Sequence, residues 1–161
     1  MKIFVPLHYD DACTAVSQAS TSFDRAVCRL DPKDEAVLEQ AVRCREAGCA
    51  ESIEAVAIGG EGCREMLHAA LAQGADQALY VKADVELEPL HIAQLLRELV
   101  LREEIRLVLM SAQTSDTRAF QIAPMLAGLL NWRQSLKVTQ FAMKNKTLKV
   151  SRLVHDTLET V

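Results

Sequence analysis

The sequence lacks an excess of positive charge, and this argues against nucleic acid as its ligand. The 18 lysines and arginines are outnumbered by 22 aspartates and glutamates, and the formal net charge is -4. A nucleic-acid binder needs a basic face to meet the phosphates. The basic residues are scattered, with one loose cluster from Lys137 to Lys149 that is typical of a solvated turn.

Long apolar runs are also missing. No stretch approaches the roughly twenty apolar residues that a membrane-spanning helix needs. The first apolar run, Ile3–Leu7, is too short for a signal peptide, and acidic residues follow it closely. We therefore expect a soluble cytoplasmic protein.

Paired cysteine spacings are absent as well. An odd number of cysteines without such spacings indicates reduced thiols in a reducing compartment. Two of them stand five positions apart, which is not a zinc spacing, and no histidine pair accompanies them. No metal site is expected. The five are Cys13, Cys28, Cys44, Cys49 and Cys63.

The sequence shows no catalytic constellation. It has no Gly-x-Ser-x-Gly elbow and no phosphate loop ending in Gly-Lys-Ser or Gly-Lys-Thr. A hydrolase or ligase would therefore lack its nucleophile or phosphate loop. Each histidine is isolated, and only His8, at the end of the first expected strand, is a candidate site residue.

What the sequence does contain is an alternation of short apolar runs and amphipathic stretches. Half of the residues are hydrophobic, which is enough for a packed core. The alternation predicts a single α/β domain over residues 1–161, with a mostly parallel sheet between two helical layers. Expected strands are 3–7, 53–58, 78–81 and 105–110, with a weaker candidate at 26–30. Expected helices are 31–47, 63–73, 88–102 and one ending near 130. Expected antiparallel strands are 137–142, 147–152 and 154–161.

A ligand site is expected beyond the carboxyl ends of the parallel strands, where the strand order reverses. Helix starts at this edge offer free amide donors to an anion such as a nucleotide phosphate. The Gly59-Gly60-Glu61-Gly62 turn would let a ligand approach the backbone, or it is merely a tight connection. In the polar loop Ser111–Arg118, Gln113 could contact an adenine or ribose edge. Ser115, Asp116 or Thr117 could instead cap the next helix.

Several segments together resemble the β subunits of electron transfer flavoproteins. Asp31-Pro32-Lys33-Asp34-Glu35, followed by Leu38–Arg43, is similar to their Asn-Pro-x-Asp-Glu … Glu-Glu-Ala-Val-Arg. Ala69–Asp76 resembles Thr-Ala-Leu-Ala-Met-Gly-Ala-Asp. Leu107–Met110, Gln113, Asp116, Gln121 and Ala127–Trp132 keep the spacing of Asp-Leu-Val-Leu-Leu-Gly-x-Gln … Gln-Thr-Gly … Ala-Gly-x-Leu-x-Trp. Leu158-Glu159-Thr160 is similar to Gly-Gly-Leu-Glu-Thr.

The resemblance implies a Rossmann-like fold of the adenine nucleotide α-hydrolase type and the role of a non-catalytic electron carrier. Such a β subunit pairs with a larger α subunit, which holds most of one FAD. The pair carries electrons from flavin dehydrogenases to a membrane-bound quinone reductase. The stretch Leu158, Glu159 and Thr160 would belong to the dehydrogenase-docking loop. The β subunit usually also holds a structural AMP.

The AMP positions of the family carry over unevenly. Phe120, Ile122 and Ala123 replace an Asn, a Thr and a Gly near the phosphate, and each lost hydrogen bond is worth about 1 kcal/mol. Arg118 could compensate with its charge. His8-Tyr9 stands where the family has Lys-Arg. AMP binding is therefore expected to be weakened. The implied nucleotide-binding residues are Pro6, Asp31, Pro32, Lys33, Asp34, Gly59, Gly60, Gln113, Asp116, Arg118 and Gln121.

Two expectations concern alternatives. Family members continue past the position of Val161 with an arm that wraps around α, so we expect a cut chain, a lost portion or a shortened paralogue. The competing function is a stand-alone AMP- or ATP-binding module of the stress-protein type. Those modules carry Gly-x-x-Gly after the strand that corresponds to 105–110, and the loop Ser111–Thr117 has no glycine.

Overall fold

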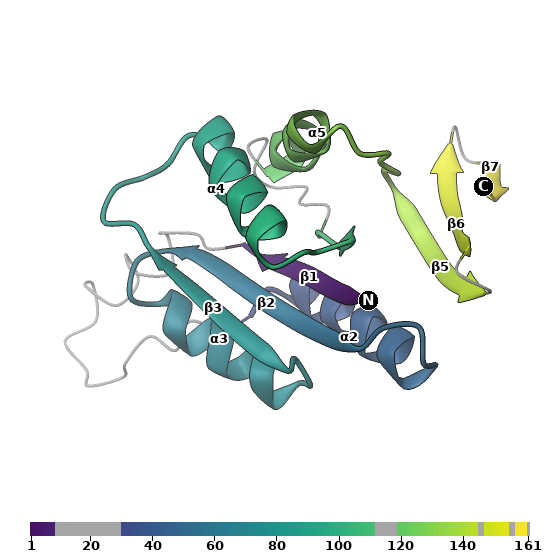
Figure 1. Ribbon diagram of the computed structural model, residues 1–161, viewed down its shortest axis with the longest axis horizontal. Coiled ribbons are helices and arrows are strands. Elements are labelled where there is room, and N and C mark those ends of the chain that lie inside the picture. The colour runs from purple at the N-terminus through teal and green to yellow at the C-terminus, as the bar shows by residue number, and fades with distance from the viewer. Residues whose placement is uncertain (9–29, 112–118, 145–146, 155–156, 161) are drawn as a thin grey trace.

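The computed structural model describes residues 1–8, 30–111, 119–144, 147–154 and 157–160 (Figure 1). Its central sheet consists of β1 (Lys2–Leu7), β2 (Ser52–Gly59), β3 (Gln77–Lys82) and β4 (Leu107–Val108). Neighbouring strands are parallel, and their spatial order is β3-β2-β1-β4. The predicted parallel sheet is confirmed.

Four helices cover the two faces of this sheet. They are α2 (Pro32–Glu46), α3 (Cys63–Ala72), α4 (Pro89–Arg102) and α5 (Ala119–Leu130). Figure 1 shows α2 and α3 on one face and α4 and α5 on the other. Successive side chains of a strand point to opposite faces, so Ile3 and Val5 join the core under α2 and α3, whereas Phe4 joins the core under α4 and α5. The predicted three-layer α/β/α architecture is confirmed.

The order of the strands creates one point where the chain reverses direction across the sheet. From β1 the chain proceeds outward to β2 and β3, and α4 then returns it to β4 on the other side of β1. The helices change face at the same step. In open α/β sheets, ligands bind beyond the carboxyl ends of the two strands that flank such a switch point. Here these strands are β1 and β4.

Local sequence signals set the boundaries of α2 as expected. Asp31 is the N-cap, and its side chain accepts a hydrogen bond from the backbone of Lys33 at 2.8 Å. Pro32 occupies the first turn, where its missing N–H costs nothing. Past the other end, Gly48 has φ +74°, a conformation that glycine adopts without strain.

All four helices that the structure describes end in the same hydrogen-bonded motif. In each, a backbone N–H two or three residues past the last helical residue donates to the carbonyl five positions earlier. The donor–acceptor distances are 2.9–3.0 Å, and the pairs are Cys49→Cys44, Ala75→Ala70, Ile105→Val100 and Trp132→Ala127.

This motif explains why β4 is shorter than the expected 105–110. The amide of Ile105 closes the end of α4 and is not available to the sheet. The ladder with β1 covers Leu107 and Val108, and the amide of Leu109 adds one bond to the carbonyl of Phe4 at 2.9 Å. The weaker candidate strand at 26–30 lies outside the described residues except for Leu30, which is buried but not in a strand.

The C-terminal residues form a separate antiparallel sheet, as predicted. It consists of β5 (Val138–Lys144), β6 (Thr147–Val154) and β7 (Thr157–Thr160), in the order β5-β6-β7. Figure 1 shows this sheet beside the α5 and β4 side of the molecule. No helix in the described ranges is both long enough and apolar enough to cross a membrane.

Candidate functional site

A buried carboxylate lies at the switch point between β1 and β4. Asp34, in the first turn of α2, is only 1% exposed. One carboxylate oxygen accepts a hydrogen bond from the backbone N–H of His8, just past β1, at 2.8 Å. The other accepts from the hydroxyl of Ser111, which follows β4. One side chain therefore connects three segments that converge at this edge of the sheet.

The environment of Asp34 opposes its ionisation. Burial is the strongest influence and raises the pKa of Asp34 above its ordinary value, and the charge of Asp31 acts in the same direction. The hydrogen bonds from Ser111 and His8 and the charge of His8 act against this shift. Since both carboxylate oxygens are used within the protein, Asp34 positions the ends of β1 and β4.

The amides at the start of α2 are also largely used within the protein. Pro32 has no N–H, the amide of Lys33 donates to the Asp31 side chain, and the amide of Glu35 donates to the Asp31 carbonyl at 2.9 Å. A helix start binds anions through such amides. The described contacts thus give Asp31 a capping role.

The glycine turn after β2 is hydrogen-bonded to the end of β3 and to the start of α3. Gly59 has φ +153°, and its carbonyl accepts bonds from the amide of Ala83 at 3.0 Å and the hydroxyl of Tyr80 at 3.3 Å. The Gly60 carbonyl accepts from the amide of Cys63 at 3.1 Å, which begins α3. These bonds account for the turn as a strand-to-helix connection. A ligand contact at Gly59 or Gly60 stays a prediction.

The other predicted site residues fall into three groups. Gln113, Asp116 and Arg118 lie outside the described residues, so their meeting with Gly59 in one crevice stays a prediction. Pro6 is buried within β1, opposite Val56 of β2. On α5, Gln121 is exposed, whereas Ile122 is 5% exposed and packs in the core with Phe4.

A cleft of about 620 Å³ extends along β4, the last strand of the parallel sheet. One of its walls is β4 itself, and the others come from α2, α5, β5 and β6. Ser111 lines this cleft and also bonds Asp34, so the cleft reaches the switch point. Ala123, expected near a phosphate, lines the cleft too. The sequence alone gave no sign of this cleft, because its walls are far apart along the chain.

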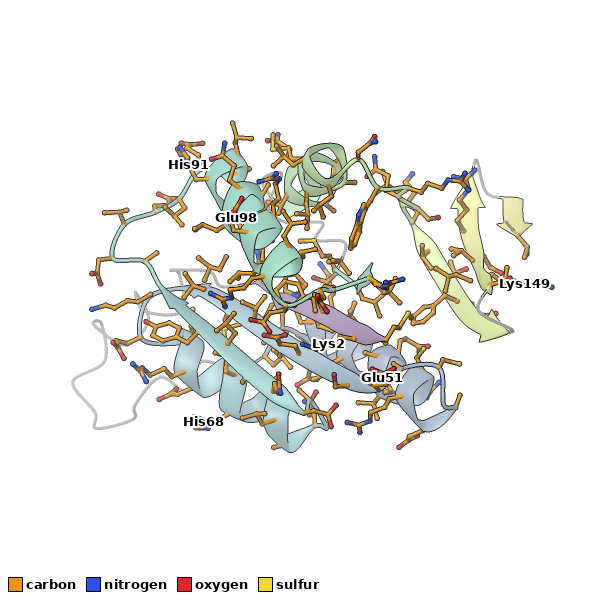
Figure 2. All side chains as sticks on the ribbon, in the orientation of Figure 1. Lys2, Glu51, His68, His91, Glu98 and Lys149 are labelled. Atoms are coloured by element: carbon orange, nitrogen blue, oxygen red, sulfur yellow. The ribbon has the colours of Figure 1, made fainter. Side chains whose placement is uncertain are left out.

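The remaining candidates are placed apart from the switch point. Leu158, Glu159 and Thr160 lie on β7, which pairs with β6. Thr160 is exposed, and its hydroxyl is 3.3 Å from that of Ser151. Figure 2 shows His68 and His91 on the outer sides of α3 and α4, far from each other. Among the three histidines in the described part of the chain, His8 is the one that reaches the site, and it does so through its backbone N–H.

Comparison with known proteins places the chain in a family. The family model described as electron transfer flavoprotein domain matches residues 23–161. The chain belongs to the electron transfer flavoprotein family. The motifs from Asp31 to Thr160 all lie inside the matched range.

Curated members of this family are similar over most of the chain. The electron transfer flavoprotein subunit beta of Dictyostelium discoideum is 38% identical over 132 residues. The proteins of the same name from Bradyrhizobium diazoefficiens and Homo sapiens are 34% identical over 132 residues and 35% identical over 136 residues. Each match covers 82% of this chain and 53% of the relative, so the chain spans about half the length of these relatives.

Proposed function

We propose that this chain acts as a β-type subunit of an electron transfer flavoprotein. It pairs with a larger FAD-carrying α subunit and helps to pass electrons from flavin dehydrogenases to a quinone reductase. The carrying observation is the family match over residues 23–161, together with three relatives named subunit beta at 34–38% identity.

FAD is the redox group of the proposed pair. When bound, FAD accepts and donates the electrons, and the resemblance assigns most of its binding to the α partner. No residue of this chain is therefore proposed to hold FAD alone. The contribution of this chain is a rigid wall, in which Asp34 fixes the ends of β1 and β4 relative to α2.

An adenylate at the switch point is the second part of the proposal. The described residues fit AMP in part. Both carboxylate oxygens of Asp34 accept hydrogen bonds from protein donors, so neither is directed toward a phosphate. Two amides at the start of α2, those of Lys33 and Glu35, are used by Asp31, so residues 112–118, which follow β4, are proposed to supply phosphate donors. AMP is proposed as a weakly held ligand, in keeping with Phe120, Ile122 and Ala123.

The proposed partners have two different contact regions. The α subunit would bind near the carboxyl edge of the parallel sheet, where the flavin is needed. Flavin dehydrogenases would bind at Leu158, Glu159 and Thr160, on β7. The cytoplasm is the proposed compartment, although relatives from rice are named mitochondrial.

Co-expression with the α-type subunit of the same organism tests the proposal. The expected result is a co-purifying pair with about one FAD per pair, measured by absorbance after denaturation. Chromatography of the released small molecules would show whether AMP accompanies it. The variant Leu158→Ala/Glu159→Ala serves as a matched control, since it should keep FAD but lose reduction by the dehydrogenase. Tight binding of AMP or ATP by this chain without any α partner would contradict the proposal.

A further inference from the structure

The hydrogen-bonded motif that ends α2 joins two cysteines, Cys44 and Cys49. The backbone N–H of Cys49 donates to the carbonyl of Cys44 at 3.0 Å, across the turn that contains Gly48. In this motif the side chains of the two bonded residues commonly contact each other. The hydrogen bond therefore holds two thiol-bearing residues close together at the end of the helix.

In two of the other three helices, both residues paired by this motif belong to the same core. In α3 the paired residues are Ala70 and Ala75, and both belong to the core under that helix. In α4 they are Val100 and Ile105, and both belong to the opposite core. Cys44 is likewise part of the α2 core, and Cys49 packs against it. The sequence thus places two thiols at a pair of positions that share one core in α3 and in α4.

The two thiols have unequal surroundings. Cys44 is 7% exposed, and burial, followed by the charge and the hydrogen bond of Cys49, raises the pKa of the Cys44 thiol. Cys49 is half-buried, and its thiol lies 3.7 Å from the carbonyl of Ala47. Cys49 is thus the thiol that a small reagent reaches, and Cys44 stands behind it.

We propose that Cys44 and Cys49 form a reversible intramolecular disulfide, a redox modification site at the C-terminal end of α2. The oxidant is a low-molecular-weight disulfide. The thiolate of Cys49 attacks one sulfur of this disulfide, which forms a mixed disulfide and releases one small thiolate. The Cys44 thiolate then attacks the Cys49 sulfur, and the second small thiolate leaves. Two protein thiols are oxidised, and one small disulfide is reduced to two thiols, each of which takes up a proton.

The geometry stabilises the disulfide but does not accelerate its formation. Burial raises the pKa of the Cys44 thiol and so disfavours its thiolate, which makes ring closure slow. The folded backbone already holds both residues together, so closing the ring orders little further chain. The site is far along α2 from Asp34, and its oxidation does not depend on the proposed electron-transfer role.

Equilibration with a glutathione redox buffer tests the inference on the whole chain. The ratio of oxidised to reduced Cys44–Cys49 is measured once in native buffer and once in concentrated urea. After acid quenching and alkylation, trypsin with a glutamate-specific protease separates the three relevant cysteines onto Cys44–Arg45, Ala47–Glu51 and Gly62–Arg64. Mass spectrometry then identifies the linked pair.

The expected equilibrium constant for the disulfide is at least about tenfold larger in the native chain than in urea. The same linkage requires a higher Tm for the oxidised chain than for the reduced one. Cys49→Ala is the matched control, because alanines fill both positions of the α3 closure, and its Tm should not respond to the buffer. A native constant equal to or below that in urea would overturn the inference. So would accumulation of glutathione on Cys49 without ring closure, or a link from Cys44 to Cys63.

Discussion

The Ser111 hydroxyl donates a hydrogen bond to Asp34, a residue 77 positions earlier in the chain. This bond joins the end of β4 to the start of α2, and the His8 amide joins the end of β1 to the same carboxylate. Asp34, which was expected to contact a nucleotide, thus connects the ends of β1 and β4 to the start of α2.

Asp34→Ala tests this positioning role. Alanine offers no acceptor, so the partly buried His8 amide and Ser111 hydroxyl both lose their partner. We expect a loss of about 1–3 kcal/mol in the free energy of unfolding, measured by urea denaturation. Ser111→Ala should lose less, and the double variant should lose less than the sum of the two. Strictly additive losses would show that the two side chains do not interact. Glu35→Gln, on the exposed side of the same turn, is the control.

Glu54 gives a prediction for pH dependence. It is 6% exposed within β2, and one of its carboxylate oxygens has no hydrogen-bond partner. Burial and then the charge of Glu103 raise the pKa of Glu54, while Lys2 and Arg102 act in the opposite direction. A raised pKa in the folded state means that the folded chain binds this proton more tightly than the unfolded chain. Stability from this group is complete below the ordinary carboxyl pKa and is lost as pH rises through the raised value.

Glu54→Gln should therefore be more stable than the natural chain at neutral pH. The advantage should shrink as the pH falls through the raised pKa of Glu54 and should be gone below the ordinary carboxyl pKa. Urea midpoints measured between pH 4 and pH 8 check this. A variant that is less stable than the natural chain at every pH would show that the carboxylate itself is favourable at this position.

Arg45 fastens the end of α2 to the neighbouring helix and strand. Its guanidinium donates to the carbonyl of Gly74 at 2.9 Å and to Asp76 at 2.6 Å. Asp76 also accepts from the amide of Ile53 at 2.8 Å. Although burial opposes it, the combined effect of Arg45 and the Ile53 amide lowers the pKa of Asp76. Stability from Asp76 is therefore present above its ordinary pKa and lost as the pH falls through the lowered value.

Arg45→Ala should destabilise the chain by about 1 kcal/mol, because the pair with Asp76 is partly screened by solvent while the bond to Gly74 is charge-assisted. Arg43→Ala is the matched control two positions away. Its pair with Glu39 is exposed at both ends and should contribute less than about 0.5 kcal/mol. Thermal unfolding of both variants separates the two cases, and equal losses would contradict the role assigned to Arg45.

Two glycines that end helices should respond differently to alanine. Gly48 has φ +74° and free space where a Cβ would lie, so Gly48→Ala should lose about 1–2 kcal/mol from backbone strain alone. Gly74 has φ +113°, and an added Cβ would lie 3.1 Å from a methyl carbon of Val42. Gly74→Ala should lose more than Gly48→Ala in urea unfolding. The reverse order would show that Val42 moves aside without cost.

The ends of the helices could largely be predicted from neighbouring residues. The bounds and order of the strands could not, because they depend on contacts between residues that are distant in sequence. Asp31, Pro32 and Gly48 mark the ends of α2 through their own backbone preferences, so the sequence predicts this helix well. Ile105 continues an apolar run, yet its amide closes α4 and shortens β4, which depends on how that helix ends. The sequence does not show which strands are neighbours. The position of the switch point, between β1 and β4, is therefore known only from the paired sheet.

The candidate site, like the fold, could be predicted from the sequence only in part. The location at the carboxyl edge follows from the alternation of strands and helices. The partnership of Asp34 with His8 and Ser111 does not, because the three residues are distant in sequence. An aspartate three residues after an N-cap normally indicates a solvated helix start. Here two strand ends cover it, and only the assembled sheet brings them there.

Electron transfer in the reconstituted pair is the most direct test of the central claim. A reduced flavin dehydrogenase is mixed with the α subunit, alone or with this chain, and the FAD absorbance of the pair is followed over time. The account predicts rapid FAD reduction in the presence of this chain, and slow or no reduction with α alone. Equal rates in the two mixtures, or failure of this chain to bind α at all, would contradict it.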